Sequence, residues 1–141
     1  MGHVMPWTYE VGIETTAAPE RIWGLFADVP GWKQWNAGIE KIELFGAFVK
    51  GATFSMQPPA SEAFTSTLIE VKENEEFTDE TVIDGTRVVV SHLLVPLAYG
   101  GTRVLYRAQV FGAAAEELGP MITADFAQVL AALKDLAERA N

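Results

Sequence analysis

The sequence contains 141 residues, of which 10 are basic and 19 acidic, so its formal net charge at pH 7 is −9. This length supports one hydrophobic core, and we expect a single domain over residues 1–141. The excess of negative charge, without a cluster of Lys or Arg, argues against nucleic acid and anionic membranes as partners. With no cysteine and only two histidines, which lie far apart in the chain, we expect neither disulfides nor a metal site.

The N-terminus gives no sign of a targeting segment. Residues 1–5 lack the positive charge and the apolar stretch of a secretory signal. No part of the chain reaches the roughly 18 consecutive apolar residues that cross a bilayer. A cytoplasmic location is therefore expected, and the sequence leaves the choice between monomer and homodimer open.

The first quarter of the chain predicts one strand and two short helices. Residues 7–15 alternate bulky apolar with polar side chains, which is the pattern of a half-buried strand. Pro19 and the acidic Glu20 mark the start of a short helix, which the segment 28–31 ends. A second short helical stretch follows at residues 32–35.

Six further strands are predicted in the middle of the chain, because β-rich runs alternate there with Gly, Pro, Asn or acidic clusters. Their expected ranges are 39–45, 52–57, 62–71, 77–83, 86–95 and 102–111.

The dipeptide Asp84-Gly85 separates two of these strands and favours a two-residue type I′ hairpin turn, which fixes the register. The predicted pairs are Ile83 with Thr86, Thr81 with Val88, Asp79 with Val90 and Phe77 with His92. The next hairpin runs through residues 97–101, and its register follows from matching the apolar faces. Its predicted pairs are Leu94 with Val104, His92 with Tyr106 and Val90 with Ala108.

Beyond Gly112 the apolar residues recur with a period near 3.6, which indicates an amphipathic helix. They are Leu118, Ile122, Phe126, Val129, Leu133 and Leu136. We expect one long helix that begins at Gly119-Pro120, because proline fits the first helical turn and breaks a helix interior.

This order of elements predicts an α+β fold. About seven antiparallel strands form a twisted, curved sheet, and the long C-terminal helix lies in its concave face. A single helix covers only part of that face. The rest must be filled by the short helices, by collapse of the sheet or by a ligand, and an internal cavity is the natural result.

Four segments carry a resemblance to a known family. They are Pro19-Glu20-Arg21-Ile22-Trp23, Trp32-Lys33-Gln34-Trp35-Asn36, Thr65-Ser66-Thr67-Leu68-Ile69-Glu70-Val71 and Gly100-Gly101-Thr102-Arg103-Val104. In these segments the sequence resembles the polyketide cyclase/dehydrase branch of the START-like (SRPBCC) superfamily. The resemblance covers almost the whole chain. It implies the helix-grip fold and a pocket for a largely apolar small molecule between the long helix and the sheet.

His92, Tyr106 and Asp79 form a candidate polar cluster. Under the predicted registers His92 faces inward with Tyr106 opposite it, and Asp79 lies diagonally on the neighbouring strand. An imidazole that a carboxylate orients can act as a general base, and a phenol can donate to an enolate oxygen. In the alternative, His92 and Tyr106 are hydrogen-bonded core residues and Asp79 points to solvent.

Further candidates are expected to line the apolar pocket. On the strands and the second short helix they are Trp35, Phe54, Met56, Val90, Leu94 and Val104. The helix-grip arrangement implies that the first half of the long helix contributes Met121, Ile122, Phe126 and Val129. Trp32 and Trp35 share one side of a helical turn and either frame the mouth of the cavity or anchor their short helix on the sheet. Asp125, one residue before Phe126, could turn toward the cavity, but a solvated helix face is expected for it.

These observations support two functions. The first is binding of a hydrophobic, aromatic or polyketide-like small molecule, with no metal or cofactor. The second is a cofactor-free polyketide cyclase or dehydratase in which His92 is the general base and Tyr106 is the acid or the oxyanion donor. The breadth of the superfamily adds a third hypothesis, a regulator that binds a partner protein.

Overall fold

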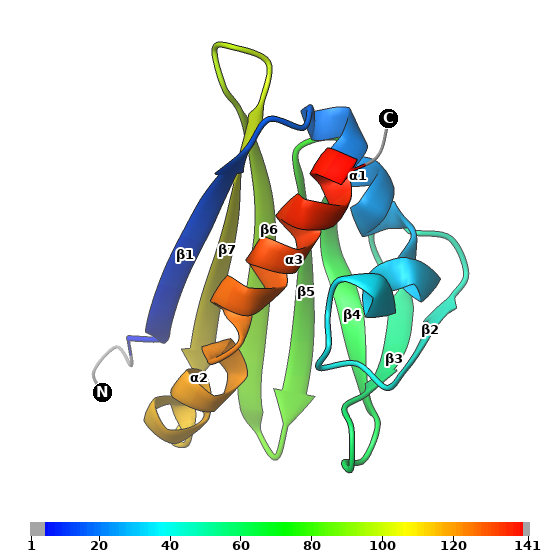
Figure 1. The fold of residues 1–141 in the computed structure, drawn as a ribbon. Coiled ribbons are helices and arrows are strands. Elements are labelled where there is room, and N and C mark those ends of the chain that lie inside the picture. Colours follow the sequence, from blue (N-terminus) through cyan, green and yellow to red (C-terminus); the bar gives the residue numbers. More distant parts are fainter. Residues whose placement is uncertain (1–4, 140–141) are drawn as a thin grey trace.

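A seven-stranded antiparallel sheet curves around a helical segment at the C-terminal end of the chain (Figure 1). The computed structural model describes residues 5–139, so the predicted absence of a targeting segment at residues 1–5 falls almost wholly outside it. The elements are β1 (Trp7–Thr15), α1 (Pro19–Ala27), the 3-10 helix η1 (Val29–Gln34), β2 (Lys41–Phe45), β3 (Thr53–Gln57), β4 (Phe64–Lys72), β5 (Glu76–Ile83), β6 (Thr86–Pro96), β7 (Thr102–Phe111), α2 (Ala115–Thr123) and α3 (Phe126–Arg139).

The order of the strands in the sheet is β1-β7-β6-β5-β4-β3-β2. Both hairpin registers predicted from the sequence are confirmed, including the pairs Asp79 with Val90 and His92 with Tyr106. Asp84 and Gly85 have φ angles of 48° and 80°, as a type I′ turn requires. The turn therefore determines which residues of β5 and β6 face the interior.

A bulge in β4 adds to the curvature of the sheet. Its register with β5 shifts between Leu68 and Glu70, so one residue of β4 is left without a partner and the strand bends there. The helices cover the concave side that results, and α3 packs against β1 and α1 (Figure 1). No helix in the described part of the chain is long and apolar enough to cross a membrane.

The C-terminal helical segment is broken, and the start predicted at Gly119-Pro120 is wrong. Helix α2 already begins at Ala115, because the Leu118 N–H donates to the Ala114 carbonyl, and Pro120 lies inside it. Proline removes one backbone hydrogen bond, and the Thr123 hydroxyl donates to the Gly119 carbonyl at 3.0 Å, a contact that bends helices. The chain turns at residues 124 and 125 before α3 begins.

One end of the concave face is closely packed. Ile22 and Phe26 from α1 meet Leu130 and Leu133 from α3 over Leu68 of the sheet, and none of these side chains is more than 1% exposed. Burial of such side chains stabilises the fold by roughly 1.5–3 kcal/mol each before ordering costs. This end of the sheet holds α3 in place, and the other end is where the cavity lies.

Candidate functional site

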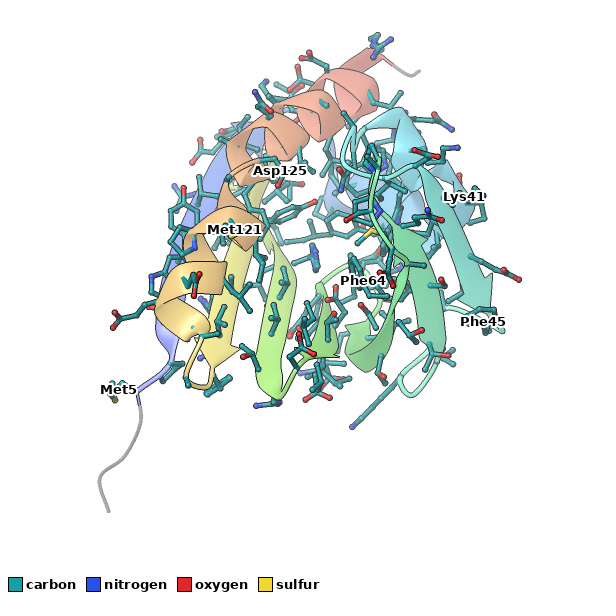
Figure 2. The ribbon with its side chains drawn as sticks, turned by 90° about the horizontal axis from the view of Figure 1, so that it is seen from below. Met5, Lys41, Phe45, Phe64, Met121 and Asp125 are labelled. Atoms are coloured by element: carbon teal, nitrogen blue, oxygen red, sulfur yellow. The ribbon has the colours of Figure 1, made fainter. Side chains whose placement is uncertain are left out.

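A cavity of about 530 Å³ lies between the concave face of the sheet, the segment after η1 and the α2–α3 break. Seen from below, Met121 and Asp125 stand on one side of the interior and Phe64 on the other (Figure 2). Its wall is formed by Trp32, Trp35, Asn36, Gly38, Phe54, Met56, Pro58, Pro59, Phe64, Ser66, Phe77, Asp79, Thr81, Ile83, Val88, Val90, His92, Tyr106, Met121, Ile122, Ala124, Asp125, Phe126 and Val129. The size and the mostly apolar wall are typical of a site for a small molecule.

Most of the side chains predicted from the sequence line this cavity. The polar candidates His92, Tyr106 and Asp79 do so, together with Trp35, Phe54, Met56, Val90, Met121, Ile122, Phe126 and Val129. Leu94 and Val104 do not. They pair with each other on β6 and β7 and are buried in the packed core, at 5% and 1% exposure, because the filled end of the concave face begins there.

His92 is held by the backbone of the neighbouring strand. Its Nδ1 lies 3.1 Å from the Phe77 carbonyl oxygen, which can only accept, so Nδ1 carries the proton in the neutral ring. The ring stacks on Phe77 with centroids 3.9 Å apart and meets the edge of Tyr106 at 4.6 Å. Burial lowers the pKa of His92 to about 3. The imidazole is therefore neutral near pH 7, and Nε2 is left as an acceptor.

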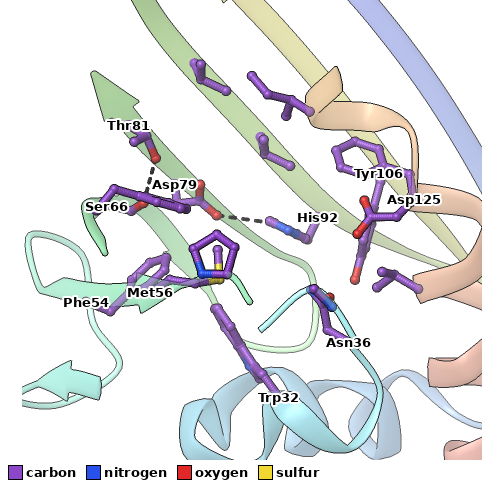
Figure 3. A pocket seen from close by; sticks show the side chains of 18 of the residues that line it. Trp32, Asn36, Phe54, Met56, Ser66, Asp79, Thr81, His92, Tyr106 and Asp125 are labelled. Carbon is purple, nitrogen blue, oxygen red and sulfur yellow. Dashed lines mark hydrogen bonds and ion pairs between the residues drawn. The ribbon is translucent and has the colours of Figure 1, made fainter. Parts of the chain in front are cut away.

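Asp79 faces the cavity and does not orient His92 directly. Its Oδ2 lies 4.0 Å from His92 Nδ1, beyond hydrogen-bond distance, and Nδ1 is already engaged by Phe77 (Figure 3). The Asp79 side chain is 14% exposed, and burial raises its pKa to about 7. Near neutral pH this carboxyl group can therefore both take up and release a proton.

Tyr106 is close enough to two carboxyl groups, those of Asp79 and Asp125, to be affected by their charge. It is 3% exposed, and its ring stands edge-on to Phe126 as well as to His92. Its hydroxyl group forms no hydrogen bond to any residue between 5 and 139 and borders the cavity. Burial raises the pKa of Tyr106, and the negative charges of Asp79 and Asp125 raise it further. The phenol stays protonated and is available as a donor.

Asp125 is half-buried and lines the cavity, because the chain turns at this residue between α2 and α3; of the two placements considered from the sequence, the one toward the cavity is found. The break turns the carboxylate toward the cavity and toward the segment after η1, where the Asn36 side chain accepts a hydrogen bond from the Gly38 N–H at 2.8 Å. A smaller hollow of about 190 Å³ shares Asp125, Asn36 and Gly38 with the main cavity. The place of Asp125 one residue before Phe126 was the only sequence signal for this position, because the periodicity treats the helix as continuous.

The two neighbouring tryptophans line the cavity and are also buried in the core, each at 5% exposure. Trp32 Nε1 donates to the Phe26 carbonyl at 2.9 Å, which ties η1 to the end of α1. Trp35 Nε1 is buried and has no hydrogen-bond partner among the described residues. The structural role predicted as an alternative therefore describes Trp32 well, while Trp35 contributes an unused donor.

Sequence reasoning did not single out the short side chains of the wall. Ser66 and Thr81, on neighbouring strands, share a hydrogen bond of 2.6 Å, and Val88 lies opposite Thr81 on β6. These three side chains are small and face inward. Small residues at inward-facing strand positions were therefore a sequence signal for the cavity. Within residues 5–139, no group of three or more His, Cys, Asp or Glu side chains could hold a metal ion.

A curved antiparallel sheet that grips a C-terminal helical segment over an internal cavity is the helix-grip arrangement of START-like domains. A protein of Mesorhizobium loti has the same fold, with a TM-score of 0.80 at 16% identity over 96% of this chain and 99% of that one. Norcoclaurine synthase from Thalictrum flavum, solved in complex with dopamine and hydroxybenzaldehyde, gives 0.76 at 15% identity over 96% and 88%. A START superfamily protein of Mycobacterium smegmatis gives 0.76 at 16% identity over 94% and 97%.

The sequence matches the polyketide cyclase / dehydrase and lipid transport family over residues 6–138, and the chain belongs to this family. Comparison with curated proteins gives no match. The resemblance inferred from the sequence is thereby confirmed, as is the helix-grip fold. Family and fold together define a START-like domain of the kind that binds hydrophobic ligands.

Proposed function

We propose that the protein binds a hydrophobic small molecule, aromatic or polyketide-like, in the cavity between the sheet and the α2–α3 segment. The observation that carries the proposal is an apolar hollow of about 530 Å³ in a chain of only 141 residues. An empty hollow lacks the packing contacts of a filled protein interior. A ligand that fills it gains roughly 25 cal/mol of binding free energy per Å² of apolar surface that it buries, before ordering costs. Trp35, Phe54 and Phe126 supply aromatic surface to the ligand.

The proposal is tested by blocking the cavity at one position. Val90 lies on the cavity wall at β6, so Val90→Phe occupies space that the ligand needs. Val95→Phe is the matched control, because Val95 lies on the same strand, is 41% exposed and does not line the cavity. Native mass spectrometry should find a small molecule that leaves only on denaturation, and naphthalene-based probes should bind with heat detectable by calorimetry.

We expect Val90→Phe to lose the bound molecule and most of the probe affinity, and Val95→Phe to keep both. If the unmodified protein carries no small molecule and binds no hydrophobic probe, the proposal fails. It also fails if Val90→Phe binds as well as the unmodified chain, because the ligand would then lie elsewhere.

A second candidate is cofactor-free cyclisation or dehydration, favoured by the unpartnered polar atoms on the wall. Such chemistry needs a base to remove a proton beside a carbonyl group and a donor for the enolate oxygen. The base expected from the sequence is His92, and the donor is Tyr106. Because burial lowers the pKa of His92 to about 3, the carboxyl group of Asp79, with a pKa of about 7, is the stronger base at neutral pH.

Exchange of α-protons separates the enzyme from the simple binding protein. In D₂O, a bound ketone such as naphthylacetone should exchange its α-protons faster than in buffer alone, and NMR follows the exchange. With Asp79 as base the rate rises through about pH 7 and is lost in Asp79→Asn. With His92 as base the rate is lost in His92→Asn instead. If exchange is no faster than in buffer, the protein does not act as a base on this class of ligand.

A further inference from the structure

The charged groups of the cavity wall are all negative. Asp79 comes from β5 and Asp125 from the break between α2 and α3, and Figure 3 shows His92 between Asp79 and the pair Tyr106 and Asp125. None of the lining residues, all of which lie within 5–139, is Lys or Arg. An apolar cavity with two carboxyl groups and no cation leaves their negative charge uncompensated, and at Asp79 burial disfavours the charged form.

The basic side chains near these carboxylates do not neutralise them. The ion pairs of Arg or Lys in the described chain join Arg87 to Glu80, Arg103 to Glu14, Arg107 to Glu10 and Lys134 to Glu138, and none of these residues lines the cavity. Lys33 borders the smaller hollow beside Asp125, but the two form no ion pair among residues 5–139. A positive charge that compensates Asp79 and Asp125 would therefore have to come from the ligand.

Two further observations point to the chemistry of the missing group. The hydroxyl of Tyr106, a residue 97% buried, faces the cavity without a partner in the described chain, and His92 offers an unprotonated Nε2 there. The wall also carries the aromatic faces of Trp32, Phe54 and Phe126. Acceptors combined with aromatic faces suit a group that is cationic and donates hydrogen bonds.

We propose that the cavity selects a hydrophobic molecule with a protonated amine, whose charge the carboxyl groups of Asp79 and Asp125 compensate, and that it rejects ligands with a carboxylate head. This inference rests on the proposed function, because it specifies the head group of the same ligand. An ammonium group beside Asp79 donates to its carboxylate, while its apolar body lies against the aromatic wall. Above about pH 7, where Asp79 is ionised as well as Asp125, a carboxylate head would meet two like charges.

Proton release gives the amine a distinctive signature. The carboxyl group of Asp79, whose pKa burial raises to about 7, faces His92, Tyr106 and Asp125. His92 and Tyr106 are uncharged near pH 6, so the ammonium is the only new charge that favours ionisation of Asp79. At that pH Asp79 is mostly protonated, and binding of the amine should expel a proton into the buffer.

Calorimetry with three matched probes tests the proposal on the full chain. Naphthylethylamine, naphthylethanol and naphthylacetate share one apolar body and differ in the charge of the head group. We expect the amine to bind about tenfold more tightly than the alcohol, and the carboxylate to bind most weakly. Titration near pH 6 in buffers of different ionisation enthalpy should report proton release for the amine and none for the alcohol.

Variants of the two carboxyl groups test which residues cause the preference for the amine. Asp79→Asn should abolish the proton release and most of the preference for the amine over the alcohol, and Asp125→Asn should reduce that preference. The control Glu80→Gln removes the same charge from the same strand outside the cavity and should change nothing. If the alcohol or the carboxylate binds as tightly as the amine, the inference is wrong and the proposed function stands. If none of the probes binds, both are wrong.

Discussion

The same strands form both ends of the concave face, but one end is filled by side chains and the other encloses the cavity. On β4, Leu68 at the packed end is fully buried, while Ser66, two residues away on the same face, lines the cavity. On β6, Leu94 belongs to the packed core and Val90 to the cavity wall. At these two pairs of positions the side chain on the cavity side is the smaller one, and the helical segment that covers the face is broken between α2 and α3. A hollow therefore arises from both layers at once.

The largest expected contrast lies along the helical segment that covers both ends. Leu133→Ala at the packed end should lower the free energy of unfolding by about 2–5 kcal/mol, because the side chain is fully buried and leaves a cavity. Met121→Ala at the cavity end should change it by less than about 0.5 kcal/mol, because Met121 is 70% exposed. Urea unfolding of both variants measures the difference. Equal losses would mean that the cavity end is packed as tightly as the core.

Enlarging a side chain should have opposite effects at the two ends of β6. Leu94→Phe overfills the packed core and should cost about 1–3 kcal/mol of unfolding free energy. Val90→Phe places the same ring in the cavity, where it gains contacts, and should stabilise the protein by about 0.5–2 kcal/mol while blocking ligand binding. Thermal unfolding of ligand-free protein distinguishes them. Destabilisation by Val90→Phe would show that the cavity cannot accept a ring.

The cavity end also holds two titratable groups, the buried His92 and the half-buried Asp79, whose contributions to stability depend on pH in opposite directions. The pKa of Asp79 is raised from 3.8 to about 7, so its contribution to stability is present below pH 3.8 and is lost as the pH rises through 7. The pKa of His92 is lowered from 6.5 to about 3, so its contribution is present above pH 6.5 and is lost as the pH falls through 3. Between about pH 4 and pH 6.5 the two contributions to the free energy of unfolding change with pH in opposite directions and largely cancel.

Replacing one of the two residues should reveal how the other makes the free energy of unfolding depend on pH, by up to about 1.4 kcal/mol per pH unit. From about pH 5 to pH 6.5 the stability of Asp79→Asn should rise relative to the unmodified protein, because only the His92 slope remains. That of His92→Asn should fall, because only the Asp79 slope remains. Urea unfolding across this range measures both. Parallel curves for all three proteins would show that neither pKa is shifted as burial requires.

Local patterns predicted the fold well, because register and topology depend on them. The Asp84-Gly85 turn alone aligned β5 with β6, and the alternation on β6 and β7 then placed His92 opposite Tyr106. The site was predicted less completely. Where the filled core ends depends on tertiary contacts, so Leu94 and Val104 could not be separated from Val90 by pattern. The break at Asp125 depends on how Pro120 and Thr123 bend one helix against the sheet.

The smallest contrast concerns the two tryptophans between the packed end and the cavity. Pro30 lies four residues after Phe26 and has no N–H, so the Phe26 carbonyl at the end of α1 lacks its usual helical donor and takes Trp32 Nε1 instead. Trp32→Phe leaves that carbonyl unpartnered, whereas Trp35→Phe removes a donor that had no partner. The first variant should therefore be less stable than the second by about 1 kcal/mol in urea unfolding. If Trp35→Phe is the less stable of the two, the indole N–H of Trp35 has a hydrogen-bond partner in solution. That partner would be a buried water molecule or the ligand. Removing the ligand by dialysis against a hydrophobic resin before the measurement distinguishes the two.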